Sequence, residues 1–372
     1  MIRHYLDHAS TSPLRPEART ALVAALDGPA GDPGRIHAEG LEARVRVETA
    51  RERVAELLGA RPREVVFTSG ATESIAAVCW GAAARGTHQV VTAVEHSAVT
   101  AAATRHGETT VVGVDGQGRV DPDALLAAVG SDTSVVHVQW GNHEVGTTQP
   151  VEAVVAGARE RGVLVHIDAA QAGGRVPVSF RDLGADLMSV SGHKWGAPAG
   201  TGVLLVRRGL RLDPLLVGSD QERARRAGLE AVAALTGLGA AAVALTDADR
   251  LADEGAEARR LTDRVLAGVA DLEGVRVHGD PVERLPHLVC LGFDDVEPQA
   301  VLLGLDRVGV AAHSGSACSS ESLEPSPTLA AMGVDALRSL RISVGWSSTD
   351  ADIDVLLAAL PEVLAGLRAL RR

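Results

Sequence analysis

Short apolar runs alternate with segments of helical pattern between residues 65 and 206 of the chain. Apolar runs bounded by turn residues indicate buried strands, and the segments between them carry the periodicity and capping residues of helices. We predict strands at 65–67, 89–94, 109–114, 134–139, 163–167, 187–190 and 202–206. We predict helices at 71–84, after Ser97, from Asp121-Pro122 and at 151–161. Strands that alternate with helices in this way predict an α/β fold with a mostly parallel sheet.

The pattern changes after Arg207 and predicts a second, smaller α+β domain. A loop that contains residues 218–228 leads into a long helical region, rich in Ala and Leu, at 229–272. The elements expected after it are strands near 274–278, 287–292 and 340–344 and helices near 299–307 and 350–370. We therefore expect a large domain of residues 12–247 and a small domain of residues 1–11 and 248–372.

Composition limits the class of protein. The 372 residues include 36 basic and 48 acidic side chains, for a formal net charge of −12, and 46% of the residues are hydrophobic. Such a chain folds into a globular protein, and its negative charge disfavours nucleic acid or an anionic membrane as a direct partner. Three cysteines without a C-x-x-C pair, and no apolar segment of signal-peptide or transmembrane length, predict a reduced, cytoplasmic protein.

Polar residues follow several of the predicted strands. Glu95-His96, Asp168 and the segment Ser191–Lys194 each come directly after an apolar run. The carboxyl ends of parallel strands meet at one edge of a sheet, where α/β proteins bind ligands. We therefore expect these residues to share one cleft.

Lys194 is the only lysine, and all other basic residues are arginines. Arginine can replace the charge of a lysine, but it cannot form a Schiff base. A lysine that condenses with an aldehyde and a carboxylate, here Asp168, that keeps a pyridine nitrogen protonated are the two obligatory contacts of pyridoxal phosphate. The alternative interpretation is a surface lysine and a helix-capping aspartate.

The segment Ser69–Ser74, between a predicted strand and a predicted helix, is a candidate phosphate site. Free N–H groups and the dipole of a helix start attract a phosphate, and Thr72 adds a hydroxyl donor. A plain turn would have the same sequence pattern. The segment is not a P-loop, because the G-x-x-x-x-G-K-[ST] pattern is absent.

The motifs Y-L-D, S-G-A-T-E-S, E-H, H-E-V-G, H-I-D-A-A-Q, S-G-H-K, G-S-A-C and L-R-I-S-V-G occur in this order. From about Tyr5 to about Leu370 the chain resembles the cysteine desulfurases, which are fold-type I pyridoxal-phosphate enzymes of the class V aminotransferase group. The resemblance implies a fold-type I transferase with the cofactor on Lys194 and Asp168 at the pyridine nitrogen. The remaining contacts that it implies are Gln171 at the ring hydroxyl, His96 stacked on the ring, and Ala71, Thr72, Ser191 and His193 at the phosphate.

Two further residues would act on the substrate. The resemblance implies that Arg341 binds the substrate carboxylate and that Cys318, in the stretch His313–Cys318, receives the sulfur. Without the resemblance, His96 would be a loop histidine and Arg341 part of a structural ion pair. The small, polar neighbours of Cys318 predict a mobile loop through Pro327, whereas the apolar neighbours of Cys79 and Cys290 predict inert buried thiols.

We therefore expect a homodimeric enzyme that converts L-cysteine to L-alanine and leaves a persulfide on Cys318 for a protein sulfur acceptor. Lys194, Cys318 and His96 are the expected catalytic residues. A selenocysteine lyase, C–S lyase or epimerase of the same fold remains an alternative, while the missing G-x-G-x-x-G disfavours a dehydrogenase. The acceptor stays open among iron–sulfur scaffolds, tRNA-thiolating enzymes, DNA-modifying systems and sulfur carriers.

Three places depart from the family pattern in the cofactor region, and one is Ile75-Ala76, where the family continues S-G-A-T-E-S with Asp-Asn. His143 stands where the family has Asn before the Glu of its N-E-I/V-G segment. Leu229 stands where the family has a Thr that reaches the neighbouring subunit's phosphate, and leucine cannot donate that hydrogen bond. We expect these changes to affect the cofactor and substrate contacts.

Overall fold

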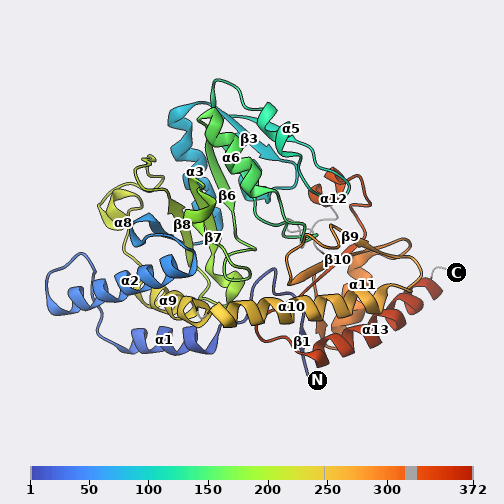
Figure 1. Cartoon of the computed structure of the whole chain (residues 1–372). Coiled ribbons are helices and arrows are strands. Elements are labelled where there is room, and N and C mark those ends of the chain that lie inside the picture. Colours follow the sequence, from blue (N-terminus) through green and yellow to red (C-terminus); the bar gives the residue numbers. More distant parts are fainter. Residues whose placement is uncertain (1, 247, 315–324, 371–372) are drawn as a thin grey trace.

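The computed structural model describes residues 2–246, 248–314 and 325–370. A seven-stranded sheet in the order β2-β8-β7-β6-β5-β3-β4 forms its centre (Figure 1). The strands are β2 (Val65–Thr68), β3 (His88–Thr92), β4 (Glu108–Val112), β5 (Thr133–Gln139), β6 (Leu164–Asp168), β7 (Leu187–Ser191) and β8 (Gly202–Val206). Neighbours among β3 to β7 are parallel, while β8 is antiparallel to β2 and β7. This mostly parallel sheet confirms the predicted α/β fold.

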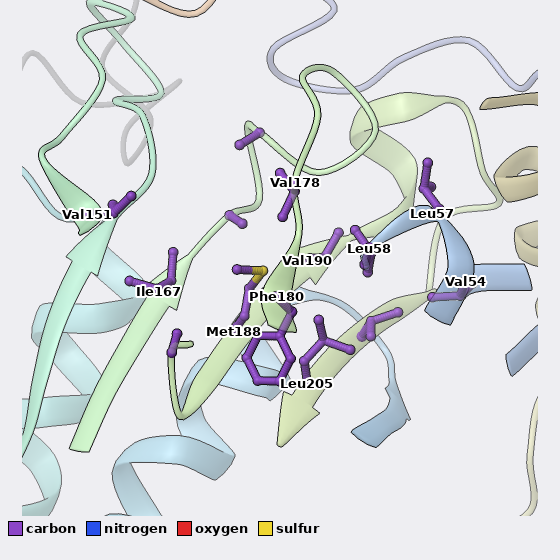
Figure 2. Packing of buried hydrophobic residues seen from close by; sticks show 14 of the residues in the cluster. Val54, Leu57, Leu58, Val151, Ile167, Val178, Phe180, Met188, Val190 and Leu205 are labelled. Carbon is purple, nitrogen blue, oxygen red and sulfur yellow. The ribbon is translucent and has the colours of Figure 1, made fainter. Parts of the chain in front are cut away.

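Helices cover both faces of the sheet, because the strands are apolar on both sides as buried parallel strands generally are. On one face, Val78 of α3 (Ala71–Ala82) packs with Leu204. On the other face, α6 (Val151–Arg161) packs in the main hydrophobic cluster with Leu205. Figure 2 shows part of this main cluster, in which the labelled residues of neighbouring strands are Ile167, Met188, Val190 and Leu205. The helices between β3 and β8 not yet named are α4 (Ser97–His106), α5 (Pro122–Ala127) and α7 (Phe180–Leu183).

The C-terminal part of the chain forms a second hydrophobic core. Its antiparallel sheet has the order β12-β10-β9, and a parallel pair joins β1 to β11. The strands are β1 (His4–Tyr5), β9 (Val275–His278), β10 (Leu288–Phe293), β11 (Val310–Ala311) and β12 (Ser339–Ser343). Helices α10 (Ala248–Val269), α11 (Pro298–Arg307) and α13 (Asp350–Ala369) pack around it (Figure 1). Leu6 belongs to this core and Ala9 to the main one, while the predicted division into domains stays a prediction.

The region predicted to be helical at 229–272 contains two helices. Helix α9 (Val232–Thr246) packs on α1 (Pro16–Asp27) and α2 (Ala38–Leu57), which the sequence patterns had not indicated. Its axis makes an angle of 82° with that of α10, which contacts α13 instead. No single helix in the described ranges is long and apolar enough to span a membrane.

The turn that contains α8 (Gln221–Ala224) is held by a buried ion pair. Both guanidinium Nη atoms of Arg51 lie 2.7 Å from the carboxylate oxygens of Glu222, and both side chains are 2% exposed. The Phe67 N–H also donates to this carboxylate, at 2.9 Å. Glu222, Arg223 and Ala224 all have left-handed backbone conformations, with φ between 48° and 61°. Such conformations cost non-glycine residues about 1–3 kcal/mol each, so the ion pair stabilises a strained turn.

We predict that Arg51→Met lowers the free energy of unfolding by about 3–5 kcal/mol, because it leaves the Glu222 carboxylate buried without a cation. Chemical denaturation measures this change. Arg3→Met is the matched control, since Arg3 pairs with Asp306 where both side chains are more than half exposed. Arg3→Met should lower the free energy of unfolding by no more than about 1 kcal/mol. Equal effects of the two substitutions would contradict the role of the buried pair.

Candidate active site

A cavity of about 530 Å³ opens at the carboxyl edge of the parallel strands. It is lined by every predicted site residue that the structure describes, namely Ala71, Thr72, His96, Asp168, Gln171, Ser191, His193, Lys194 and Arg341. Cys318 lies outside the described residues. The fold thus brings together in one cavity side chains that are up to 270 positions apart in the sequence.

The turn between β2 and α3 forms one end of the cavity. Gly70 precedes α3, whose first residues present N–H groups without partners inside the helix. A side chain on Gly202 would place its Cβ 2.4 Å from the Gly70 Cα, so the close packing of this turn on β8 requires glycine. Glu73 accepts from the Ser69 N–H at 2.8 Å and pairs with Arg226 at 2.9 Å. The turn is thus fixed from two sides and can hold a phosphate.

Lys194 follows β7 in a 3-10 turn at Gly192–Trp195 and is directed at the N-terminal segment. Its Nζ donates to the carbonyl oxygens of Ala9, at 2.5 Å, and Ser10, at 2.9 Å. Burial lowers the pKa of Lys194 to about 8, and the nearby Arg341 guanidinium acts in the same direction. The only lysine is therefore a largely buried amine whose pKa lies about two units below its ordinary value.

Asp168 and His96 also line the cavity. Asp168 is the last residue of β6, and its Oδ1 accepts from the Ala170 N–H at 3.0 Å. Burial raises the pKa of Asp168, so a cation beside this carboxylate would be favoured. Burial lowers the pKa of His96, which is therefore neutral.

Glu95 does not line the cavity, although its position after β3 predicted that it would. Its side chain points inward, where Oε1 accepts from the Thr92 hydroxyl at 2.7 Å and from the Gln139 N–H at 2.9 Å. Burial raises the pKa of Glu95 to about 8, so this residue is mainly a protonated structural acid at neutral pH.

Arg341 forms an ion pair and also has a place in the wall of the cavity. It lines the cavity, and its Nη2 donates to Asp7 at 3.0 Å and to the Ser10 hydroxyl at 2.7 Å. Its Nη1 donates to the His143 carbonyl at 2.8 Å. Its Nε is buried without a hydrogen-bond partner among the described residues. An ion pair thus orients the guanidinium at the cavity wall.

Gln171 is held by protein partners on both amide atoms. Its Nε2 donates to the Ala9 carbonyl at 2.9 Å, and its Oε1 lies 3.2 Å from His287 Nε2. His193 contacts the Thr11 hydroxyl at 3.1 Å, and burial lowers the pKa of His193 to about 4. Both side chains are therefore preorganised and uncharged at the cavity wall.

Sequence reasoning missed the contribution of residues 7–10 to this site. Asp7 orients Arg341, while the carbonyls of Ala9 and Ser10 hold Lys194. The Y-L-D motif that ends at Asp7 was the available signal. Backbone carbonyls leave no signal in side-chain patterns, so Ala9 and Ser10 could not have been identified from the sequence.

The structure describes two of the three cysteines and the C-terminal end of the predicted mobile loop. Cys79 and Cys290 are buried free thiols, as predicted, and burial raises the pKa of Cys79 to about 12. The prediction of a mobile loop through Pro327 is wrong at its end, because Ser326 is buried and Pro327 begins α12 (Pro327–Ala331). The Ser326 hydroxyl donates to Glu144 at 2.7 Å and caps this helix.

The model of the family described as Aminotransferase class-V matches residues 4–356. A cysteine desulfurase of Trichormus azollae is 40% identical over 98% of this chain and 94% of its own length. The chain is a member of the cysteine desulfurase family. Among solved structures, the chain resembles a NifS-like protein with a TM-score of 0.90 and 30% sequence identity. The match covers 98% of this chain and 100% of that protein. The chain also resembles a structure described as SspA in complex with cysteine, with a TM-score of 0.81 and 25% identity over 93% and 100% of the two chains.

We predict that the ε-amine of Lys194 titrates near pH 8 in this cysteine desulfurase when no aldehyde is bound, rather than near the ordinary value of 10.5. The ammonium form would dominate below that pH and the free amine above it. Nuclear magnetic resonance with isotope-labelled lysine measures the midpoint directly, since the chain has one lysine. Arg341→Met should raise the midpoint and Asp168→Asn should lower it. A midpoint near 10.5 in the folded protein would contradict the prediction, and the unfolded chain provides that reference.

Proposed function

We propose that the protein is a pyridoxal-phosphate-dependent cysteine desulfurase that uses Lys194 and Cys318. The observation that carries the proposal is the buried amine of its only lysine, in one cavity with the buried Asp168 carboxylate. Three features of the cavity fit the cofactor. They are an amine for its aldehyde, an anion for its pyridinium nitrogen, and free N–H groups at the start of α3 for its phosphate.

The residues proposed to hold the cofactor follow from these features and from the family motifs. Lys194 would bind the aldehyde carbon, Asp168 the ring nitrogen and Gln171 the ring hydroxyl, with His96 against the ring. Ala71, Thr72, Ser191 and His193 would hold the phosphate. When bound, the cofactor supplies an acceptor for the electron pair that remains at the substrate α-carbon after deprotonation.

The chain's own residues would then act on L-cysteine. Arg341 binds its carboxylate with a guanidinium that Asp7 and Ser10 already orient. The Lys194 amine, whose pKa is lowered by burial and by Arg341, moves the α-proton close to neutral pH. Asp168 keeps a negative charge beside the ring nitrogen.

Cys318 would take the sulfur atom. A new S–S bond forms between its thiolate and the substrate sulfur as the C–S bond of the substrate breaks. The bonding electrons remain with the carbon skeleton, which is protonated and leaves as L-alanine. The persulfide on Cys318 then passes its terminal sulfur to an acceptor. The SspA structure in complex with cysteine supports L-cysteine as the substrate class.

The proposal also includes the sulfur acceptor, the cellular location, the oligomeric state and the domain division of the enzyme. The net charge of −12 favours a protein or small thiol over free nucleic acid as the direct acceptor. We propose a cytoplasmic homodimer, in which Leu229, 63% exposed in the single chain, lies toward the neighbouring subunit. The two hydrophobic cores support a division into domains near residue 247.

We predict that the purified protein is yellow and that borohydride fixes the cofactor on Lys194. Lys194→Arg keeps the positive charge but cannot form the Schiff base, so it should be colourless. Absorption spectra and mass spectrometry of the reduced peptide measure this. A Lys194→Arg variant that stays yellow, with the label fixed elsewhere, would refute the assignment.

We further predict that Cys318→Ala lowers sulfide and alanine production from L-cysteine by about two orders of magnitude or more, because the sulfur acceptor thiol is lost. Its absorption change on addition of L-cysteine should persist. Cys79→Ala and Cys290→Ala are matched controls, since their buried thiols lie outside the cavity lining. If Cys318→Ala keeps full sulfide release, a C–S lyase or selenocysteine lyase replaces the persulfide mechanism.

A further inference from the structure

Arg175 is a buried arginine, 8% exposed, that binds the turn carrying Lys194. Its Nη2 donates to the Lys194 carbonyl at 2.5 Å and to the Ser12 hydroxyl at 2.7 Å. Its longer contacts reach the carbonyls of Val344, at 3.4 Å, and His8, at 3.5 Å. The guanidinium therefore ties the backbone of the lysine to the N-terminal segment and to the residue that follows β12.

The N-terminal anchor of Arg175 is itself fixed. The Ser12 hydroxyl accepts from Arg175, so its own proton points to His8 Nδ1, at 2.8 Å. Burial, Arg175 and Arg15 lower the pKa of His8 to about 3, and the neutral ring can accept this bond. The Ser12 N–H donates to the His193 carbonyl at 2.9 Å, one residue before the lysine. The anchor and the lysine turn are thus held to each other by two independent contacts.

A second arginine holds the next carbonyl of the same turn and provides a comparison. Arg15 Nε donates to the Trp195 carbonyl at 2.8 Å, and its two Nη atoms donate to Glu254 of α10 at 2.8 and 2.5 Å. A carboxylate therefore balances the charge of Arg15. Within the described ranges, Arg175 binds carbonyls and a hydroxyl instead, and its Nε is buried without a partner. Only one of the two arginines is compensated.

A buried guanidinium without a carboxylate is unfavourable. Burial and the neighbouring Arg15 lower the pKa of Arg175 to about 10, although Glu254 acts in the opposite direction. A carboxylate beside Arg175 would remove this cost. It would also cancel the positive charge that Arg175 presents to the Lys194 amine.

The charges that act on the Lys194 amine come from several elements. Arg341 and Arg175 lower its pKa, whereas Asp7 and Asp168 raise it. Arg341 and Asp7 form an ion pair, so Arg175 is the cation that opposes Asp168 without a partner of its own. The rings that share this electrostatic environment have pKa values lowered by burial, and they are His96, His143, His193, His287 and His313.

We propose that Arg175 is a positioning residue for Lys194: its guanidinium holds the lysine carbonyl and supplies an uncompensated positive charge that favours the neutral amine. This rests on the proposed function, in which that amine attacks the cofactor aldehyde and takes up the α-proton. Both steps need the neutral form. Arg175 does not line the cavity, so it acts through the lysine and not on the substrate.

The test measures the titration of Lys194 in the folded, aldehyde-free chain by nuclear magnetic resonance with isotope-labelled lysine. Arg175→Gln removes the charge and keeps an N–H donor. Arg175→Lys keeps the charge, and combining it with Lys194→Arg assigns the additional lysine signal. The matched control combines Arg15→Gln with Glu254→Gln, which removes the neighbouring contact to the turn without a change in net charge.

We expect Arg175→Gln to raise the Lys194 midpoint by about half a pH unit or more, because the ammonium form loses a like charge nearby. Arg175→Lys and the control pair should stay within about 0.3 pH units of the unmodified protein. Near-ultraviolet circular dichroism shows whether each variant is folded. If Arg175→Gln does not fold, Arg175→Met, which fills the space without a polar group, should give the same rise.

An unchanged midpoint in a folded variant without the charge overturns the proposal. An equal rise in the control pair also overturns it, because a loosened turn that hydrates the amine would then explain both results. The same holds if Arg175→Lys titrates like Arg175→Gln. Failure of the proposed function has a different signature, in which the unmodified protein shows no cofactor band with pyridoxal phosphate, whatever the midpoint of Lys194.

Discussion

The hydrogen bonds of residues 7–12 connect the two parts of the chain that form the cavity. The Ala9 carbonyl accepts from Lys194 Nζ and from Gln171 Nε2, both on the large sheet's side, while the Ala9 N–H donates to the Ser343 hydroxyl of β12. Buried backbone groups must be paired, and here side chains from both parts of the chain pair with the backbone of Ala9. A movement of β12 relative to the large sheet would displace the acceptors of Lys194. The position of the reactive amine therefore depends on how the two cores pack together.

The electrostatics of the cavity follow from the same segment. Arg341 lowers the pKa of Lys194, and Asp7, which pairs with Arg341 at 3.0 Å, raises it. The Asp7 carboxylate thus stabilises the buried guanidinium of Arg341 and limits how far Arg341 lowers the pKa of Lys194. Without Asp7, an unpaired buried cation next to Lys194 would be strongly unfavourable. Asp168 acts from the other side, where its negative charge favours the ammonium form of the same lysine.

Site residues could be predicted from the sequence where a reactive side chain directly follows a recognisable strand. Asp168 and Lys194 could be predicted because each follows an apolar strand, and the carboxyl ends of parallel strands converge. The separation of α9 and α10 could not be predicted, since no glycine or proline interrupts residues 245–250. Helix α9 packs in the main core, whereas most of the buried residues of α10 belong to the second one. Ala9 escaped prediction because its contribution is a carbonyl, which every residue has. Ser326 escaped it because a polar serine in a Pro-rich stretch is typical of a loop, and only the tertiary contact with Glu144 buries it.

Described residues on both sides of the stretch that contains Cys318 are held by hydrogen bonds. On the N-terminal side, Ser314 accepts from the Ser339 hydroxyl at 2.6 Å, and His313 pairs with Arg341 by backbone hydrogen bonds. On the C-terminal side, Ser326 is fixed to Glu144, the neighbour of His143. His313 lines the cavity, and the five residues from it to position 318 span at most about 18 Å even when fully extended. Chain length alone thus limits how far the proposed sulfur acceptor can lie from the substrate. If Cys318 carries the sulfur as proposed, an acceptor would therefore have to meet it within this distance of His313.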